Sequence, residues 1–415
     1  MRFACASLAA AIVLSSLSGC SKSSSTIGVS PSKIETPDQA LVRQNIVGAT
    51  QSFGIDIFKT LDAGVSDSNL FISPLSMTMA LLMTANGARG ETQVEILHAI
   101  GCDNVSMDDA NQVAQNMLND FTTKSPSVCC QIANSIWYRN TFPVKHDFIA
   151  TDSSYYNAAV KALDFTDPTA PAVINQWVSD NTNGKIPSII DKIEDNDQLI
   201  LLNAVYFKGQ WALPFDSSAT RNEPFYLADG TSKTCAMMRT DKPFAYYQDQ
   251  HAQYVELDYD SSDFSMLLIL PDSTQTATAF VQSMTPAGLD SIYAKLSVQE
   301  INLYLPQCKF SCMKDLVAAL GKLGIQKAFV PGSANFMNIT DDSSLFISKL
   351  QQKAFLKICE GGTEAAAVTI GVISDTSIGI MPPIMYINRP YICILREKTT
   401  NTILFIGKIM DPTAS

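Results

Sequence analysis

The chain has 415 residues, of which 46% are hydrophobic and 17% are charged. This length allows one large domain or two or three ordinary ones, with enough apolar residues to bury a large core. The formal net charge of −11 and the sequence pI of about 4.8 argue against nucleic-acid binding and against a heparin-type polyanionic cofactor, because both need a basic surface. We therefore expect neither of these partners.

The first twenty residues are typical of an export signal. Arg2 supplies a short positive region, and residues 3–17 are apolar or small. Residues 17–20, Leu-Ser-Gly-Cys, match a bacterial lipobox, in which the cysteine becomes the lipidated first residue. The apolar run is too short for an ordinary transmembrane helix. We therefore expect removal of residues 1–19 and a lipid on Cys20 that anchors the protein to the bacterial cell envelope, at the outer membrane, facing the periplasm or the surface. The alternative is an ordinary cleaved signal with a chance cysteine.

Eight cysteines remain when Cys5 and Cys20 are set aside: Cys102, Cys129, Cys130, Cys235, Cys308, Cys312, Cys359 and Cys393. An exported location permits disulfides, but the spacing forms neither a small disulfide scaffold nor a Cys-x-x-Cys metal pair. Most of these cysteines lie in apolar segments, which favours buried thiols. One or two disulfides are the alternative.

Helices are expected to dominate the first part of the folded chain. Residues 20–39 are rich in serine and predict a flexible tether, so the domain is expected to span residues 40–412. Residues 41–61 have the apolar spacing of a helix. A second helix is expected after Ser73, as its N-cap, with Pro74 at the first helical position. Two further helices are expected at 91–100 and 108–122, after the break made by Gly87 and Gly90.

Strands are expected to dominate the remainder. Long apolar runs at 128–138 and 198–208 predict central strands covered on both faces. The other expected strands are 223–227, 234–238, 254–257, 266–270, 301–305 and 350–359, with a closing hairpin at 391–396 and 402–409. The other expected helices are 276–295, divided at Pro286 and Gly288, and 314–324, closed by its glycine. With no internal repeat and no second linker, the chain is predicted to form one mixed α+β domain.

Residues 360–377 form the most informative segment. The flexible pair Gly361 and Gly362 is followed by small residues and then by β-branched ones. Glu364 interrupts them, and no proline occurs before Pro382. Such a segment suits an exposed loop as well as a β-strand, so it predicts a switch in which a loop inserts into a sheet.

A series of motifs, in a fixed order along nearly the whole mature chain, resembles the serpin family. They are Asn69-Leu-Phe-Ile-Ser-Pro-Leu-Ser76, Gly87-Ala-Arg-Gly-Glu-Thr92, Asn203-Ala-Val-Tyr-Phe-Lys-Gly-Gln-Trp211, Leu305-Pro306, Ala334-Asn-Phe336, Lys353-Ala-Phe355, Gly362-Thr-Glu-Ala-Ala-Ala367, Asn388-Arg-Pro390 and Leu404-Phe-Ile-Gly-Lys408. The resemblance implies the serpin fold, with three β-sheets, eight or nine helices and an exposed reactive-centre loop at about residues 361–383.

The resemblance also implies a suicide-type inhibitor of serine proteases. A protease cleaves the loop and forms an acyl-enzyme, and the freed loop inserts as a new strand of the sheet called A. Side chains alternate between the faces of such a strand. The inward set would be Thr363, Ala365, Ala367, Thr369 and Gly371, while Glu364 would face solvent. At roughly 3.3 Å per residue, the segment from Thr363 to Thr376 would span about 46 Å.

Three groups of residues match functional regions of the family. The hinge is matched by Glu360, Gly362, Thr363, Glu364, Ala365, Ala366 and Ala367. The shutter, a hydrogen-bonded cluster under sheet A, is matched by Ser73, Ser76, Asn203 and Gln352, and the breach at the top of the sheet by Trp211. Two residues depart from the family pattern. Gln352 replaces a frequent histidine, and Gln307 replaces a frequent lysine, so Glu360 is expected to lack that salt-bridge partner; Lys309 lies two residues further on.

The loop sequence indicates the class of target protease. Counting fourteen residues from Thr363 places the scissile bond after Thr376 and before Ser377, with cleavage after Ser377 or Ile378 as alternatives. Small residues there suit the shallow pocket of elastase-like or subtilisin-like serine proteases, and papain-like cysteine proteases are a further candidate class. No Arg or Lys lies between Gly361 and Ile387, so trypsin-like proteases are not expected targets.

Two other functions compete with inhibition. The first is a non-inhibitory serpin that acts as a binding or carrier module, although non-inhibitory relatives often carry charge or bulk in a hinge that is clean here. The second is a hydrolase, which is disfavoured because the chain has only His98, His146 and His251 and lacks Gly-x-Ser-x-Gly and His-Glu-x-x-His motifs. We therefore expect a monomer that is not an enzyme and needs no cofactor or metal.

Overall fold

A computed structural model describes residues 34–65, 67–125, 127–260, 262–363 and 381–414. The chain divides into two units, Met1–Ser30 and Pro31–Ser415, and the fold below is that of the second unit. The predicted lipidation site Cys20, the predicted scissile residues Thr376 and Ser377, and the hinge residues Glu364, Ala365, Ala366 and Ala367 lie outside the described residues.

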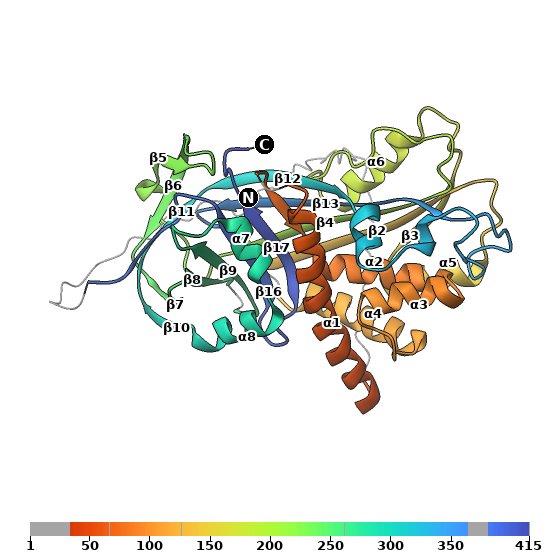
Figure 1. The fold of residues 1–415 in the computed structure, drawn as a ribbon, viewed down its shortest axis with the longest axis horizontal. Helices are drawn as coiled ribbons and strands as arrows, with labels where there is room; N and C mark the ends of the chain where they lie inside the picture. Colours follow the sequence, from red (N-terminus) through yellow and green to blue (C-terminus); the bar gives the residue numbers. More distant parts are fainter. Residues whose placement is uncertain (1–33, 66, 126, 261, 364–380, 415) are drawn as a thin grey trace, which may run out of the picture. The chain divides into compact units, whose positions relative to one another are not determined.

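The described part contains nine α-helices (Figure 1). They are α1 (Pro37–Asp62), α2 (Pro74–Gly87), α3 (Gly90–Ala99), α4 (Met107–Thr123), α5 (His146–Tyr156), α6 (Ala170–Asn181), α7 (Ala277–Ser283), α8 (Pro286–Lys295) and α9 (Val317–Lys322). Two short 3-10 helices, η1 (Ser217–Ala219) and η2 (Lys327–Phe329), complete the helical elements. Ser73 is the N-cap of α2, and its hydroxyl accepts a hydrogen bond from the backbone N–H of Ser76, so the predicted cap is confirmed.

Three β-sheets form, as expected for this fold class. Sheet A has the order β12 (Cys308–Asp315), β13 (Ile347–Cys359), β14 (Gly362–Thr363), β4 (Leu199–Gln210), β2 (Val128–Arg139) and β3 (Ala159–Leu163). Sheet B has the order β1 (Leu70–Ile72), β17 (Ile403–Ile409), β16 (Tyr391–Glu397), β9 (Phe264–Pro271), β8 (Ala252–Asp258), β7 (Pro243–Gln248) and β10 (Ser297–Glu300). Sheet C has the order β15 (Ile384–Tyr386), β11 (Asn302–Pro306), β6 (Ser232–Thr240) and β5 (Arg221–Tyr226).

Sheet A is covered on both faces, as the apolar runs predict. Alternate residues of β4 enter two different cores. Leu199, Leu201 and Val205 belong to the main core, and Ile200 and Leu202 to a second core that also contains residues of α6. Because side chains of a strand alternate between faces, the odd-numbered residues of β4, including Asn203, face the main core.

At two places the structure has another type of element than the one expected. The helix α1 begins at Pro37, so the predicted tether ends before residue 39. Thr36 and Gln39 form a reciprocal capping box, which satisfies free N–H groups at the helix start. The second error concerns residues 314–324. Only Val317–Lys322 are α-helical, while Lys314 and Asp315 end the strand β12, which pairs with β13 along its length.

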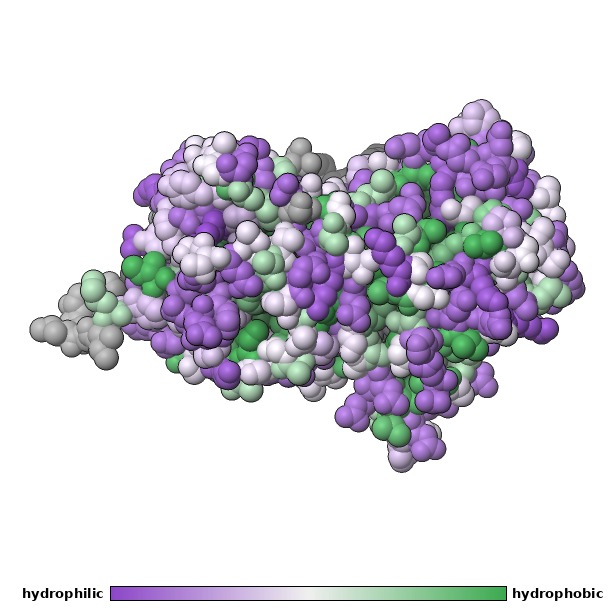
Figure 2. All heavy atoms as spheres, viewed as in Figure 1, coloured by the Kyte–Doolittle hydropathy of each residue, from purple (hydrophilic) through white to green (hydrophobic). Residues whose placement is uncertain are grey.

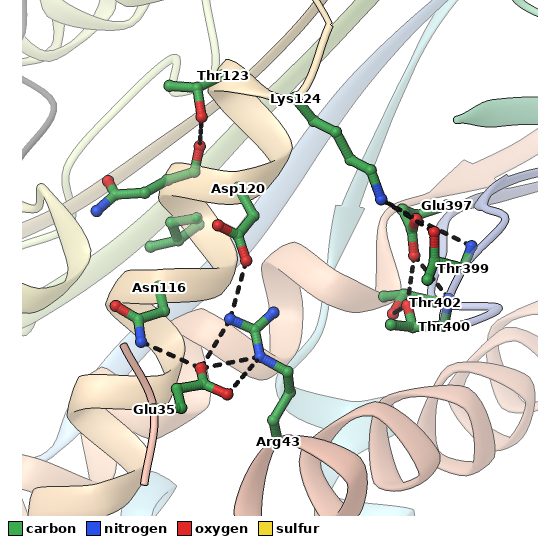
Figure 3. A network of polar contacts seen from close by, with 12 residues as sticks. Glu35, Arg43, Asn116, Asp120, Thr123, Lys124, Glu397, Thr399, Thr400 and Thr402 are labelled. Atoms are coloured by element: carbon green, nitrogen blue, oxygen red, sulfur yellow. Dashed lines mark hydrogen bonds and ion pairs between the residues drawn. The ribbon is translucent and has the colours of Figure 1, made fainter. Parts of the chain in front are cut away.

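Two polar clusters anchor the C-terminal half of α4 and its C-cap, Lys124 (Figure 3). In the first cluster, the guanidinium of Arg43 contacts the carboxylates of Glu35, at 2.7 Å, and Asp120, at 2.9 Å, and Asn116 donates to Glu35 at 3.1 Å. In the second, Lys124 pairs with Glu397 of β16. The clusters therefore join α4 to α1 and to the turn between β16 and β17.

Among the described residues, all eight cysteines beyond Cys20 are thiols outside disulfide bonds, which agrees with the favoured alternative. Six are buried, and Cys129 and Cys359 are partly exposed. Burial raises the pKa of the Cys130 thiol to about 12, and that of Cys102 also to about 12. These two thiols are therefore protonated at neutral pH.

Large exposed hydrophobic side chains come from many separate elements, for example Val94 of α3, Val173 of α6 and Met313 of β12. The face shown in Figure 2 is mostly hydrophilic, with hydrophobic residues scattered among them. Among the described residues, no helix combines the length and the apolar character needed to cross a bilayer.

Candidate functional site

The short strand β14 lies where a longer strand would have to enter sheet A. Gly362 and Thr363 pair antiparallel with Cys359 and Ile358 of β13 on one side. On the other side they pair antiparallel with β4, at Gln210 and Gly209. The hinge thus already occupies a strand position between β13 and β4.

Beyond β14, toward the N-terminal ends of β13 and β4, these two strands pair directly with each other. Their parallel register runs from Ile347 opposite Leu199 to Phe355 opposite Tyr206. The sheet is therefore closed along most of its length and separated only at the end where the hinge enters. If β14 were extended beyond Thr363, β13 and β4 would have to move apart by one strand width, about 4.8 Å.

Gly362 fits its position only because it lacks a side chain. Its φ of 144° lies in a region that other residues rarely adopt. A Cβ atom there would lie 2.1 Å from the carbonyl oxygen of Gly209, closer than any real contact. The glycine therefore allows the turn out of β13 to pack against the backbone of β4.

Thr363 points into the body, as its predicted parity requires. Its side chain is 1% exposed, and its hydroxyl shares a hydrogen bond of 2.6 Å with that of Tyr259. Burial raises the pKa of Tyr259 well above its ordinary value, so the phenol stays neutral. Trp211 stacks on Tyr259 with ring centroids 4.6 Å apart, and its Nε1 donates to the carbonyl of Cys359 at 3.0 Å. The predicted breach residue thus supports the hinge directly.

Glu360 has polar partners although Gln307 stands where the resemblance implies a lysine. Its Oε1 accepts hydrogen bonds from Gln307 at 2.7 Å and from Thr220 at 2.6 Å. Its carbonyl accepts from the backbone N–H of Phe215 at 2.9 Å. Two neutral donors therefore take the place of the salt bridge that the resemblance implies, and Lys309 is not needed for this role.

The four predicted shutter residues form one buried network. Gln352 accepts from the backbone N–H of Ser73 at 2.8 Å and donates to the carbonyl of the same residue at 3.1 Å. It also donates to Oδ1 of Asn203 at 2.7 Å. Asn203 in turn donates to Ser76 of α2 and to Asn134 of β2, at 2.6 Å for the latter. Gln352 thus joins α2, β13 and β4 at a position where the resemblance implies a histidine.

Four contributors to the site were not singled out from the sequence: Tyr259, Asn134, Gln307 as a hydrogen-bond donor, and Thr220. Asn134 carried a detectable signal, because an amide inside an apolar strand is expected to need a buried partner. Thr220 and Tyr259 carried no local signal, because only the tertiary fold brings them to their partners. Thr220 bonds Glu360, 140 positions away in the sequence, and Tyr259 bonds Thr363, 104 positions away.

The chain belongs to the serpin family. The family model described as "Serpin (serine protease inhibitor)" matches residues 48–412. The leukocyte elastase inhibitor of Sus scrofa is 33% identical over 384 residues, covering 89% of this chain and all of the relative.

Solved serpin structures share the fold. Tengpin, a thermophilic serpin in its native state, is similar with a TM-score of 0.83 and 28% identity, over 92% of this chain and 97% of tengpin. Human thyroxine-binding globulin complexed with thyroxine is equally similar, with a TM-score of 0.83 and 28% identity, over 90% of this chain and 100% of that protein. The fold class predicted from the sequence is therefore confirmed.

Proposed function

We propose that the protein is a suicide-type inhibitor of serine proteases that acts by loop cleavage and insertion into sheet A. The observation that carries the proposal is β14, since the hinge already pairs with both strands that would flank an inserted loop. The elastase inhibitors among the relatives support the same class of activity. The small residues around Thr376 and Ser377 favour an elastase-like or subtilisin-like target, with papain-like cysteine proteases as a further class.

The register of β14 assigns a position to each residue of the inserted strand. Six residues beyond Thr363, Thr369 would lie opposite Asn203 of β4 and opposite Gln352 of β13. These two residues are now direct neighbours and hydrogen-bonded. Insertion would separate Asn203 from Gln352, and the hydroxyl of Thr369 would come to lie between them. A hydroxyl can donate a hydrogen bond to one of these amides and accept one from the other. The loop sequence therefore supplies a replacement for the bond that opening breaks.

The direct test is incubation with an elastase-like protease, followed by a denaturing gel. We expect a covalent complex at the summed mass of the protein and the protease, because the acyl-enzyme is trapped before water releases it. Mass spectrometry of the small fragment released from the loop then identifies the scissile bond. Complete cleavage without any complex would contradict inhibition.

A second candidate function is a non-inhibitory binding or carrier module. It is favoured by one observation, the structural similarity to human thyroxine-binding globulin at a TM-score of 0.83. The same gel separates the two functions, because a carrier with a cleavable loop would appear only as the clipped chain.

We also propose that the protein is attached to the bacterial cell envelope through a lipid on Cys20. The support is the lipobox at residues 17–20 in front of a serine-rich segment. Labelled palmitate should be incorporated by the parent chain and not by Cys20→Ala. Equal labelling of both would contradict the anchor.

A further inference from the structure

A pocket separate from the hinge lies between α7, α8 and the hairpin of β7 and β8, elements that can be followed in Figure 1. Its volume is about 380 Å³, within the range of small-molecule sites. Its lining residues include none of the hinge, shutter or breach residues. A ligand here would therefore serve a function other than strand insertion.

The inner wall of the pocket is apolar and largely aromatic. Tyr254, Phe280, Met284 and Leu289 are buried and line it. Tyr247 stacks on Tyr254, with ring centroids 5.5 Å apart and an interplanar angle of 17°. Aromatic rings pack well against other rings in stacked or edge-on geometry, so the wall suits a flat aromatic ligand.

Two of the pocket's described lining residues carry a full charge, Asp249 and Lys295. The carboxylate of Asp249 is turned toward its own hairpin, where it accepts from the backbone N–H groups of His251, at 2.8 Å, and Ala252, at 3.0 Å. The hydroxyl oxygen of Tyr254 also lies 3.5 Å from Oδ1 of Asp249. The negative charge is thus already stabilised by donors of the chain.

Lys295 is in a different situation. It is the last residue of α8 and is exposed, and its Nζ lies 5.3 Å from the ring centroid of Tyr247. Among the described residues it forms no salt bridge. An ammonium group without an anionic partner therefore stands beside the aromatic wall, where it remains in contact with water.

We propose that this pocket binds a small aromatic carboxylate. The ring would lie against Tyr247, Tyr254 and Phe280, and the carboxylate would accept a hydrogen bond from Nζ of Lys295. An anion held beside an exposed lysine keeps part of its hydration, so its binding avoids the large cost of burying a charge. A cationic aromatic ligand is less favoured, because two backbone N–H groups already donate to Oδ1 of Asp249 and reduce the attraction of this carboxylate for a cation.

The test is isothermal titration of the full chain with 2-naphthoate, which carries two fused rings and one carboxylate. We expect saturable binding of one molecule per chain. The neutral 2-naphthamide should bind at least tenfold more weakly to the same unmodified protein, because it lacks the charge that Lys295 stabilises. This comparison needs no variant and is independent of any change in folding.

Two variants and one control locate the site. Lys295→Met should weaken 2-naphthoate binding at least tenfold, and Ser291→Trp should abolish it by filling the pocket from α8. The control is Lys322→Met, which removes an exposed lysine from the last turn of α9. Protease trapping should be unchanged in all three.

Four outcomes would overturn the proposal. They are the absence of saturable binding, equal affinity for 2-naphthamide, tighter binding of 2-naphthylmethylammonium, and unchanged affinity in Lys295→Met. The third outcome would assign the charge preference of the pocket to Asp249, and the second would reduce the site to a non-specific apolar surface.

Discussion

Thr363 is the residue on which the insertion mechanism depends most directly. It is buried against Tyr259 in the uncleaved protein. In a strand that continued beyond Thr363, the next residue, Glu364, would point to the opposite face. Replacing the buried hydroxyl by a charged side chain would place an unpaired cation in the sheet, at a cost of several kcal/mol. The same charge at the following position would remain in solvent.

These two positions give a matched pair of variants. Because Thr363 is already buried in β14, Thr363→Arg should displace β14 from sheet A in the intact protein. Insertion would then have to bury the cation, so it should slow and turn the inhibitor into a substrate, with cleaved chain replacing covalent complex on the gel. Glu364→Arg, with the same new side chain one residue further on, should form complex as the parent does. If Thr363→Arg trapped protease as efficiently as Glu364→Arg, the inward orientation would have no role in inhibition.

The sequence predicted the identity of the site residues better than it predicted their partners. Ser73, Ser76, Asn203 and Gln352 were assigned to one cluster from motifs, and they form one. The replacement of a lysine by Gln307 suggested a missing partner for Glu360, but the side-chain amide of Gln307, between β11 and β12, donates to Glu360 itself. The motifs specify residue types at fixed spacings, whereas a hydrogen bond also depends on which strands the fold brings together.

At the scale of elements, α4 is held to sheet B by one buried carboxylate. Burial alone would raise the pKa of Glu397, but hydrogen bonds from Lys124, Thr400 and Thr399 outweigh it and lower the pKa to about 2 (Figure 3). A depressed carboxylate pKa contributes stability above the unfolded value of about 4.5 and loses it as the pH falls toward 2. The contact between α4 and the β16–β17 turn should therefore weaken in acid.

Lys124→Met tests this contact. Loss of the charged donor leaves Glu397 buried with only its neutral partners Thr399 and Thr400. The free energy of unfolding at pH 7 should therefore fall by roughly 1.5–3 kcal/mol. The pKa of Glu397 should move up, and the loss of stability between pH 5 and pH 3 should shrink relative to the parent. Thermal unfolding across this pH range measures both effects, with Lys322→Met as the control. A parent-like melting temperature at pH 7 would show that the ion pair contributes nothing.

Element types were predicted best where local pattern and tertiary pairing agree. The long strands β2 and β4 were predicted from their apolar runs. The helix α2 was predicted from Pro74, which follows the N-cap Ser73. Residues 314–324 were assigned to one helix because their local pattern is helical, yet pairing with β13 draws the first two into β12. The two-residue strand β14 has no pattern of its own, since it exists only because β13 and β4 separate there.

At the scale of the whole molecule, the fold leaves sheet A open at the end where β14 enters, and the small residues of the loop follow β14 in the sequence. The closed part of the sheet is held by the pairing of β13 with β4 and by the buried bond between Gln352 and Asn203. An inserted loop would exchange this single interface for two, each with a full set of strand hydrogen bonds. The cleaved chain should therefore be more stable than the intact one, and this gain in stability is what drives the inhibition we propose.

The most direct measurement is the thermal unfolding midpoint of the intact protein compared with that of the same protein cleaved in its loop by an elastase-like protease. Insertion predicts that the cleaved form unfolds at a clearly higher temperature, with circular dichroism showing added β-structure. A cleaved form that unfolds at the same temperature as the intact protein, or at a lower one, would contradict insertion and with it the inhibitory mechanism.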